Sequence, residues 1–158
     1  MTLPLVSVIV PNYNHAPFLE LRLRTIREQS FSDIEIILLD DKSSDHSLKI
    51  LKDFAAQTPS SQLWVNEVNS GSPFHQWMKG ARLAKGKYLW IAESDDFAMA
   101  DLLQRNVDML ENNPNAVMAF CQSIFVDEHD RELNSYAENY RFIYKTDRWD
   151  HDFVADGK

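Results

Sequence analysis

Glycine and cysteine are scarce in this 158-residue chain, which has four glycines and one cysteine. Cys121 cannot form an internal disulfide, and because it lies in an apolar run we expect a small buried core residue rather than a reactive thiol. Three of the glycines, Gly71, Gly80 and Gly86, fall within one short stretch. Glycine is used where the backbone needs freedom or close approach, so this stretch is a candidate for a binding site.

Basic runs and long hydrophobic segments are also absent. The 16 Lys and Arg residues are outnumbered by 24 Asp and Glu, which gives a net charge of −8. We therefore do not expect the chain to bind nucleic acid, or an anionic membrane, through a broad basic surface. No apolar stretch approaches the ~20 residues of a membrane span, and residues 1–4 do not resemble a signal peptide. These absences favour a cytoplasmic protein.

Several catalytic motifs are missing. There is no GxGxxG and no GxxxxGK[ST], which excludes a dinucleotide-binding loop and a P-loop. GxSxG, HExxH and CxxC are absent as well. The histidines show no metal-ligand spacing, so we expect surface or capping roles for them; they are His15, His46, His75, His129 and His151.

Short apolar runs alternate with helical patterns along the first two thirds of the chain. Strands are predicted over 5–10, 34–39, 63–68 and 88–92. Helices are predicted over 17–30, over 74–84 and over 97–112, and a further helix is predicted that is capped by Ser44 or Asp45 and ends at about 57. The long apolar run 116–126 predicts a further strand that continues or turns into another. This alternation predicts an α/β fold with a mostly parallel sheet flanked by helices.

A polar cluster follows each of the first four predicted strands. The clusters cover residues 11–15, 40–45, 69–72 and 93–96. Each one alone is explained by a turn and a helix cap. Because ligands bind beyond the carboxyl ends of parallel strands, four such clusters together predict a shared ligand site at one edge of the sheet.

The fourth cluster contains three acids, Glu93, Asp95 and Asp96, within four residues. Carboxylates this close repel one another unless a cation is present. Oxygen ligands without nearby Cys or His suit a hard divalent ion, Mg²⁺ or Mn²⁺. The alternative, in which Asp95 or Asp96 only caps the helix predicted from Phe97, uses a single oxygen.

Two further residues have open interpretations. Asp41 either accepts hydrogen bonds from a ribose or a base N–H, or forms an Asx-type turn with Ser43. Tyr13 either stacks on a nucleobase or packs half-buried against the protein.

Four segments, taken in order, resemble the family 2 glycosyltransferases. They are VSVIVPNYNH at 6–15, LLDDKSSD at 38–45, NSGSPFHQW at 69–77 and GARLAKGKYLWIAESDD at 80–96. The resemblance covers residues 5–127. It implies the GT-A fold, a Rossmann-like fold of transferases that use nucleoside diphosphate sugars.

The resemblance also implies roles for individual residues. Residues 11–13, with Pro11 and Tyr13, form the wall beside the nucleotide base, and Asp41 recognises that base. Asn69 and Lys85 lie in segments that border the donor pocket.

Glu93, Ser94 and Asp95 stand at the family's DxD motif. By the resemblance, Asp95 is the metal ligand, and Glu93 and Asp96 assist it at the donor sugar or ribose. The implied cofactor is Mn²⁺ or Mg²⁺.

The chain departs from the family pattern at two places. Glu93 replaces the usual first Asp, which lengthens the side chain but keeps the charge. Residues 76–78, Gln-Trp-Met, stand where many members have Ala-Arg-Asn, which removes a cationic contact to the diphosphate.

The resemblance predicts two regions, a donor-binding region over 1–127 and the start of an acceptor-side region or tail over 128–158. We expect the domain to be incomplete at its C-terminus and the catalytic base to lie beyond this chain, since nothing in the tail marks Asp147, Asp150 or Asp152 as a base.

The implied activity is inverting transfer of a sugar from a nucleoside diphosphate sugar, with a UDP-sugar as the first choice. The acceptor is a hydroxyl of a glycan or lipid-linked molecule in polysaccharide synthesis, and regions outside this chain would contact the inner membrane face. The alternative is a non-catalytic module that binds a nucleotide sugar or a partner. A receiver domain is disfavoured because its acidic pair follows the first strand, whereas the pairs here follow the second and fourth.

Overall fold

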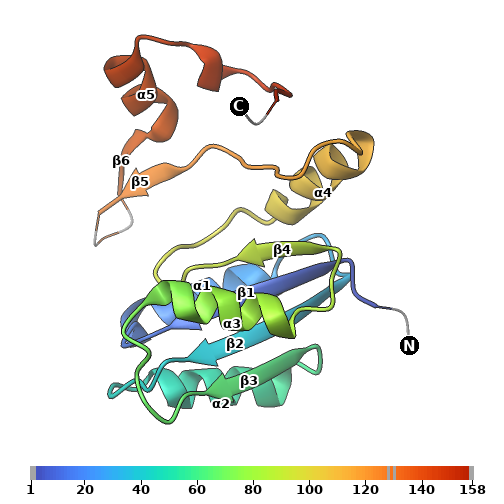
Figure 1. Cartoon of the computed structure of the whole chain (residues 1–158). Helices are drawn as coiled ribbons and strands as arrows, with labels where there is room; N and C mark the ends of the chain where they lie inside the picture. The colour runs from blue at the N-terminus through green and yellow to red at the C-terminus, as the bar shows by residue number, and fades with distance from the viewer. Residues whose placement is uncertain (1–2, 128, 130, 157–158) are drawn as a thin grey trace. The chain divides into compact units, whose positions relative to one another are not determined.

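The computed structural model describes residues 3–127, 129 and 131–156, and the chain forms two compact units, residues 1–104 and 105–158 (Figure 1). The first unit holds a four-stranded sheet in the order β3-β2-β1-β4, and every pair of neighbours is parallel. Its strands are β1 (Val6–Asn12), β2 (Ile34–Asp40), β3 (Ser61–Val65) and β4 (Tyr88–Ile91). The predicted parallel α/β architecture is confirmed.

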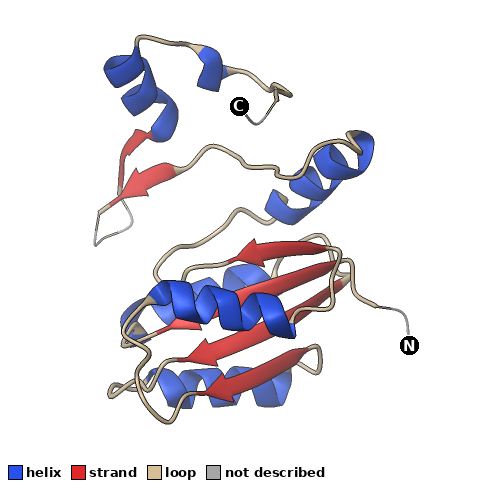
Figure 2. Ribbon diagram, viewed as in Figure 1, coloured by secondary structure: helices blue, strands red, loops and turns tan. Residues whose placement is uncertain are grey.

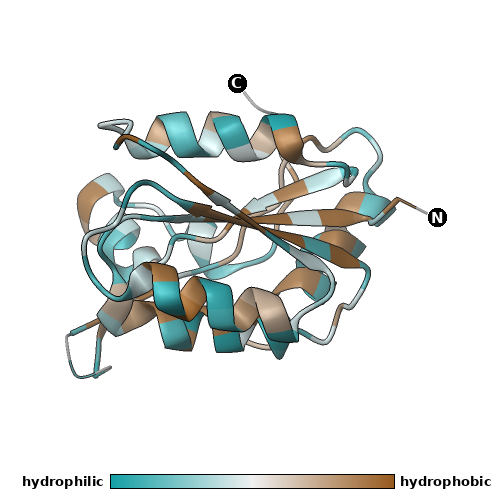
Figure 3. Cartoon of the chain, turned by 90° about the horizontal axis from the view of Figure 1, so that it is seen from below, coloured by the Kyte–Doolittle hydropathy of each residue, from teal (hydrophilic) through white to brown (hydrophobic). Residues whose placement is uncertain are grey.

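Helices cover both faces of this sheet. They are α1 (Ala16–Arg27), α2 (Ser47–Gln57) and α3 (Pro73–Leu83). The helices α1 and α2 lie side by side on one face, and α3 lies on the other (Figure 2). Strands buried on both faces need continuous apolar sequence, and the central strands are accordingly among the most hydrophobic parts of the chain (Figure 3).

Alternation along β1 divides its side chains between the two helical layers. Ile9 packs in a cluster with Ile37 and Leu39, and Leu83 of α3 lies against that cluster. A Cβ added at Gly80 of α3 would collide with the Ile9 side chain. Glycine at position 80 therefore lets α3 approach the sheet closely.

The starts of two helices can be compared with the prediction. Helix α2 begins at Ser47 with His46 at its N-cap position, and the Asp45 carboxylate, one residue further out, accepts the Ser47 N–H at 2.9 Å. Helix α4 (Leu102–Asn112) begins five residues after Phe97. The reason is that carbonyls in the intervening loop bond elsewhere: Met99 O accepts from the Gln29 side chain, and Ala100 O accepts from Ser30 N.

The second unit contains an antiparallel pair, β5 (Ile124–Val126) and β6 (Glu132–Ser135), followed by α5 (Tyr136–Tyr144) and a 3₁₀ turn (Arg148–Asp150). Its aromatic side chains contact one another, with Trp149 against Phe120, Tyr140 and Phe153.

The strand predicted over 116–126 is confirmed only for 124–126, which pairs with β6, and residues 116–123 form no strand in the described part of the chain. The expectation of a buried Cys121 is wrong: Cys121 is exposed, because it lies in this segment without strand pairing. None of the helices in the described residues has the length and apolar character that a membrane crossing requires.

Candidate functional site

The loops that follow β1, β2, β3 and β4 meet at the carboxyl edge of the sheet. They surround a cavity of about 320 Å³. Its lining residues are Pro11, Asn12, Tyr13, His15, Asp41, Asn69, Gly71, Ser72, Pro73, Gln76, Glu93 and Ser94. The structure thus brings all four predicted polar clusters to one place.

Asp41 is the buried acid of this pocket and is only 4% exposed. Its Oδ1 atom accepts hydrogen bonds from the Asn66 side chain at 2.6 Å, from Ser70 N at 2.9 Å and from the Gln76 side chain at 2.8 Å. Its Oδ2 atom accepts from the Ser70 hydroxyl at 2.7 Å. These four donors balance the buried charge and fix the carboxylate in one orientation.

The Asx-type interpretation of Asp41 is not what the structure shows. The carboxylate that accepts the Ser43 N–H, at 3.0 Å, belongs to the preceding residue, Asp40. Asp40 also accepts from the Asn12 side chain at 3.1 Å. Asp40 therefore shapes the turn, and Asp41 faces the pocket.

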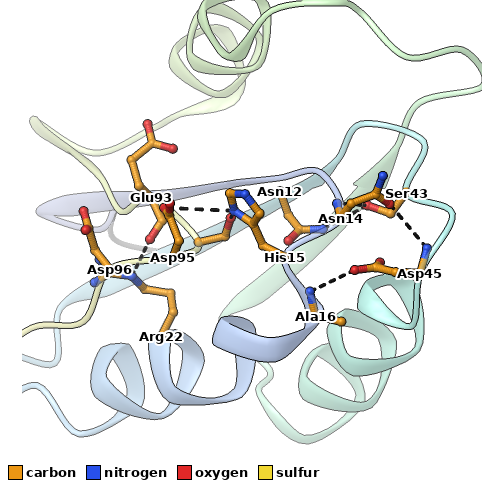
Figure 4. A network of polar contacts seen from close by, with 11 residues as sticks. Asn12, Asn14, His15, Ala16, Arg22, Ser43, Asp45, Glu93, Asp95 and Asp96 are labelled. Carbon is orange, nitrogen blue, oxygen red and sulfur yellow. Dashed lines mark hydrogen bonds and ion pairs between the residues drawn. The ribbon is translucent and has the colours of Figure 1, made fainter. Parts of the chain in front are cut away.

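Side-chain hydrogen bonds tie the loop after β1 to the loop after β2 (Figure 4). The Asn14 Oδ1 atom accepts from Ser44 N at 2.7 Å. Asp45 accepts the Ala16 N–H, at the first residue of α1, at 3.0 Å. Because Asn14 has a positive φ of 56°, a conformation that asparagine tolerates better than most residues, the sequence at this position matches the backbone.

We call residues 93–96 the acidic loop. Its residue Ser94 lies 2.7 Å from the His15 ring, between the hydroxyl oxygen and Nδ1. The same Nδ1 atom is 4.0 Å from Asp95 Oδ1, and the Asp95 side chain is 51% exposed. Asp95 thus stands open to solvent beside His15; neither Asp95 nor Asp96 lines the pocket itself, whereas the adjacent Ser94 does.

Arg22 of α1 holds the other side of the acidic loop (Figure 4). Its Nε atom donates to the backbone oxygen of Glu93 at 2.7 Å, and its Nη2 atom is 3.8 Å from Asp96 Oδ2. Burial lowers the pKa of the guanidinium, and the negative charges of the acidic loop, led by Asp96, oppose that shift.

Two carboxyls of the acidic loop, Glu93 and Asp96, have a raised pKa. Burial is the main cause for Glu93, and the charges of Asp95 and Asp96 raise its pKa further, whereas interaction with the Trp77 indole acts in the opposite direction. Burial also raises the pKa of Asp96, and the positive charge of Arg22 counteracts this rise.

The donor set of this loop fits one mode of divalent cation binding. Within the described residues, no three His, Cys, Asp or Glu side chains form a ready-made cage. Mg²⁺ and similar hard ions are commonly held by one or two carboxylates and complete their shell with substrate phosphates and water. An open carboxylate such as Asp95, adjacent to the pocket-lining Ser94, suits that mode.

The remaining predicted site residues fall into two places. Tyr13 is 48% exposed at the pocket, and the Asn69 side chain donates to Asp41 O at 2.9 Å. Lys85 is not brought to the pocket: its backbone N–H donates to Ser7 Oγ and Glu35 Oε1, near the opposite end of β1. Glycine Gly71, with a φ of 76°, forms the turn beside Asn69.

Sequence reasoning does not identify the individual roles of three residues at the site. His15 falls in the predicted polar cluster 11–15, but a surface or capping role is expected for its side chain, and Gln76 stands out only as a departure from the family pattern. Arg22 carried a signal that could have been found, because it lies on the same helical face as Leu19 and Ile26, where a charged residue is unusual.

Comparison with known proteins places this site in a family. The family model Glycosyl transferase family 2 matches residues 7–157, and the chain therefore belongs to glycosyltransferase family 2. An uncharacterised glycosyltransferase of Haemophilus influenzae is 29% identical over 146 residues, which make up 92% of this chain and 58% of that protein.

Solved structures agree with the predicted GT-A fold. S. aureus TarS 1–349 in complex with UDP-GlcNAc is 25% identical with a TM-score of 0.65, over 69% of this chain and 33% of that chain. The mannosyltransferase PcManGT from Pyrobaculum calidifontis, in complex with GDP-Man and Mn²⁺, is 26% identical with a TM-score of 0.63, over 82% and 38%. The chain thus spans well under two thirds of the length of each of these proteins.

Proposed function

We propose that the pocket binds the nucleoside diphosphate sugar of an inverting glycosyltransferase that transfers the sugar to a hydroxyl acceptor during glycan synthesis. The observation that carries this proposal is the meeting of the acidic loop and the N-terminal end of α3 around one pocket. Ser72, which caps α3, and Pro73, in its first turn, both line that pocket. The positive end of a helix dipole favours an anionic ligand such as a diphosphate.

Each wall of the pocket has a role in this proposal. Tyr13 and Pro11 offer a surface on which the nucleotide base packs, and the fixed carboxylate of Asp41 faces the base as a hydrogen-bond acceptor. Asn69 and Ser94 contact the donor between the base and the sugar. Lys85 does not line the pocket, and its proposed role at the donor rests on the family resemblance alone.

Asp95 is the proposed metal ligand, with Glu93 and Asp96 beside it. A bound Mn²⁺ or Mg²⁺ would neutralise the negative charge that develops on the leaving diphosphate. The two complexes named above hold UDP-GlcNAc and GDP-Man with Mn²⁺, so both uracil and guanine nucleotides are candidate donors here. Residues 1–127 form the proposed donor-binding region, and residue 128, where the proposed acceptor side begins, lies outside the described residues.

Calorimetric titration with UDP, GDP, CDP and dTDP, each with Mn²⁺ and with EDTA, tests the proposal. We expect one nucleotide to bind with Mn²⁺ and to bind more weakly with EDTA. Asp95→Ala should lose at least tenfold of the Mn²⁺-dependent affinity, which is about 1.4 kcal/mol. Glu20→Ala, which removes an exposed acid from α1, is the matched control and should bind as the unchanged protein does.

The proposal fails if no nucleotide binds, or if Asp95→Ala keeps the full Mn²⁺ dependence. A second outcome separates the two classes of function. Binding without any sugar transfer, by a protein extended to the length of its relatives, would indicate a non-catalytic nucleotide-sugar-binding module.

A further inference from the structure

Arg22 is a charged residue in an apolar setting, and the proposed function does not use it. It lies on the inward face of α1 with Leu19, Leu23 and Ile26, and it is only 3% exposed. Moving a guanidinium out of water is strongly unfavourable unless partners compensate for the lost hydration. The contacts of Arg22 therefore indicate why an arginine is kept at this position.

The partners of Arg22 all belong to β4 or to the acidic loop that follows it. The Nε atom donates to the Glu93 backbone oxygen at 2.7 Å, Nη2 lies 3.8 Å from Asp96 Oδ2, and the guanidinium is 5.6 Å from the centre of the Trp90 ring. Figure 4 shows Arg22 reaching from α1 to the base of the acidic loop.

Stability alone does not account for this arginine. Its Nη1 atom is buried and makes no hydrogen bond. A buried ion pair that is only partly satisfied is often no more stable than an apolar side chain of similar volume. An apolar residue at position 22 would fill the space, but the Glu93 carbonyl would lose its hydrogen bond and Asp96 would lose its ion pair.

The two neighbouring aspartates of the acidic loop lie near different side chains. Asp96 Oδ2 lies 3.8 Å from Arg22 Nη2, although the Asp96 side chain stays 71% exposed, and Asp95 lies beside His15 and is 51% exposed. The buried guanidinium therefore contacts the loop at Asp96 and not at Asp95, while both carboxylates remain open to solvent.

We propose that Arg22 is a positioning residue of the acidic loop. It fixes the loop at the Glu93 carbonyl and takes Asp96 as its counter-ion, and in this way it sets the position of the neighbouring Asp95, the proposed metal ligand. This inference rests on the proposed function for its ligand, and it refines the metal assignment by giving Asp96 a structural partner.

Hydrogen exchange on the ligand-free protein tests the positioning role without any nucleotide. We compare Arg22→Met and Arg22→Lys with Arg24→Met, a matched control on the exposed face of the same helix. In Arg22→Met we expect the amides of residues 94–96 to exchange at least tenfold faster, with an intermediate effect in Arg22→Lys and no change in Arg24→Met. Unchanged exchange in both Arg22 variants would overturn the proposal.

Titration with UDP and GDP, in Mn²⁺ and in EDTA, then tests the consequence for the metal. Arg22→Met should lose at least tenfold of the affinity gained from Mn²⁺ while its affinity in EDTA stays as before, and Arg22→Lys should recover part of the loss. An equal loss in both conditions would indicate a general packing role and would overturn the proposal.

The two experiments separate the two proposals. If the unchanged protein shows no Mn²⁺-dependent binding, the proposed function fails, and the hydrogen exchange still decides whether Arg22 holds the loop. Should Arg22→Met fail to fold, Arg22→Lys provides the same comparison, since it keeps the charge but loses the planar fork of donors.

Discussion

At the scale of single residues, the surroundings of Glu93 in the acidic loop raise the pKa of its carboxyl. The carboxyl is partly buried beside Asp95 and Asp96, so the folded protein binds its proton more readily than the unfolded chain does. Below its ordinary pKa of 4.5, the Glu93 carboxyl is protonated in both the folded and the unfolded protein, and its contribution to stability is fully present. That support is lost as the pH rises through the raised pKa of the folded protein.

We therefore expect Glu93→Gln to be more stable than the unchanged protein at pH 7. The neutral amide removes the unfavourable charge. The advantage should shrink as the pH falls through the raised pKa of Glu93 and should be gone below pH 4.5, where Glu93 is protonated in both states. Thermal unfolding at pH 7 and at pH 4 measures both differences. Glu20→Gln, an exposed control, should differ little at either pH, and a Glu93→Gln protein less stable at pH 7 would contradict the prediction.

At the scale of elements, the site depends on how closely α3 lies on the sheet. Gln76 and Gly80 are buried on the same face of α3, one turn apart, so the contact that seats the helix on Ile9 also presents Gln76 to Asp41. The N-terminal turn of α3 reaches the pocket through Ser72 and Pro73. Displacement of this helix would therefore move its N-terminal end away from the pocket and break the hydrogen bond from Gln76 to Asp41.

We predict that Gly80→Ala lowers the free energy of unfolding by about 1–3 kcal/mol, because the added methyl overlaps Ile9 in a packed core. The direction of the change is informative, because Gly→Ala in an unobstructed helix raises the free energy of unfolding by up to about 1 kcal/mol. Urea denaturation measures the change. In the double variant Gly80→Ala with Ile9→Ala the two losses should be clearly less than additive, and simple additivity would contradict the packing explanation.

At the scale of the whole molecule, a chain with a net charge of −8 places the three acids of the acidic loop at the same edge of the sheet as Asp41. Those acids lie where the proposed ligand is also anionic, so a cation is the natural bridge between them. Binding of that ligand to the folded state alone would stabilise the entire first unit, because residues from four separate loops line the pocket.

We expect the nucleotide that binds to raise the melting temperature when Mn²⁺ is present. At a ligand concentration of 100 Kd the stabilisation is about 2.7 kcal/mol. For a chain of this size the melting temperature shifts by about 2–4 °C for each kcal/mol. Thermal shift with UDP and GDP, in MnCl2 and in EDTA, measures it. A rise of equal size in EDTA would argue against a metal-bridged site.

The sequence by itself determined the order of the strands and helices in the first unit and the places where its polar clusters fall. Apolar runs of four to seven residues, separated by helical periods, leave a parallel sheet as the arrangement that buries them. The same logic failed for residues 116–123, because an apolar run becomes a strand only where a neighbouring strand completes its hydrogen bonds.

Only the tertiary structure decided which residues of those clusters act together. Arg22, Glu93 and Asp96 come from segments about 70 residues apart, and no local pattern records that α1 delivers its one inward arginine to the acidic loop. The same holds for the hydrogen bonds of Asp41 and for the separation of Lys85 from the pocket. Such contacts depend on helix rotation and loop closure, which packing sets across the whole sheet.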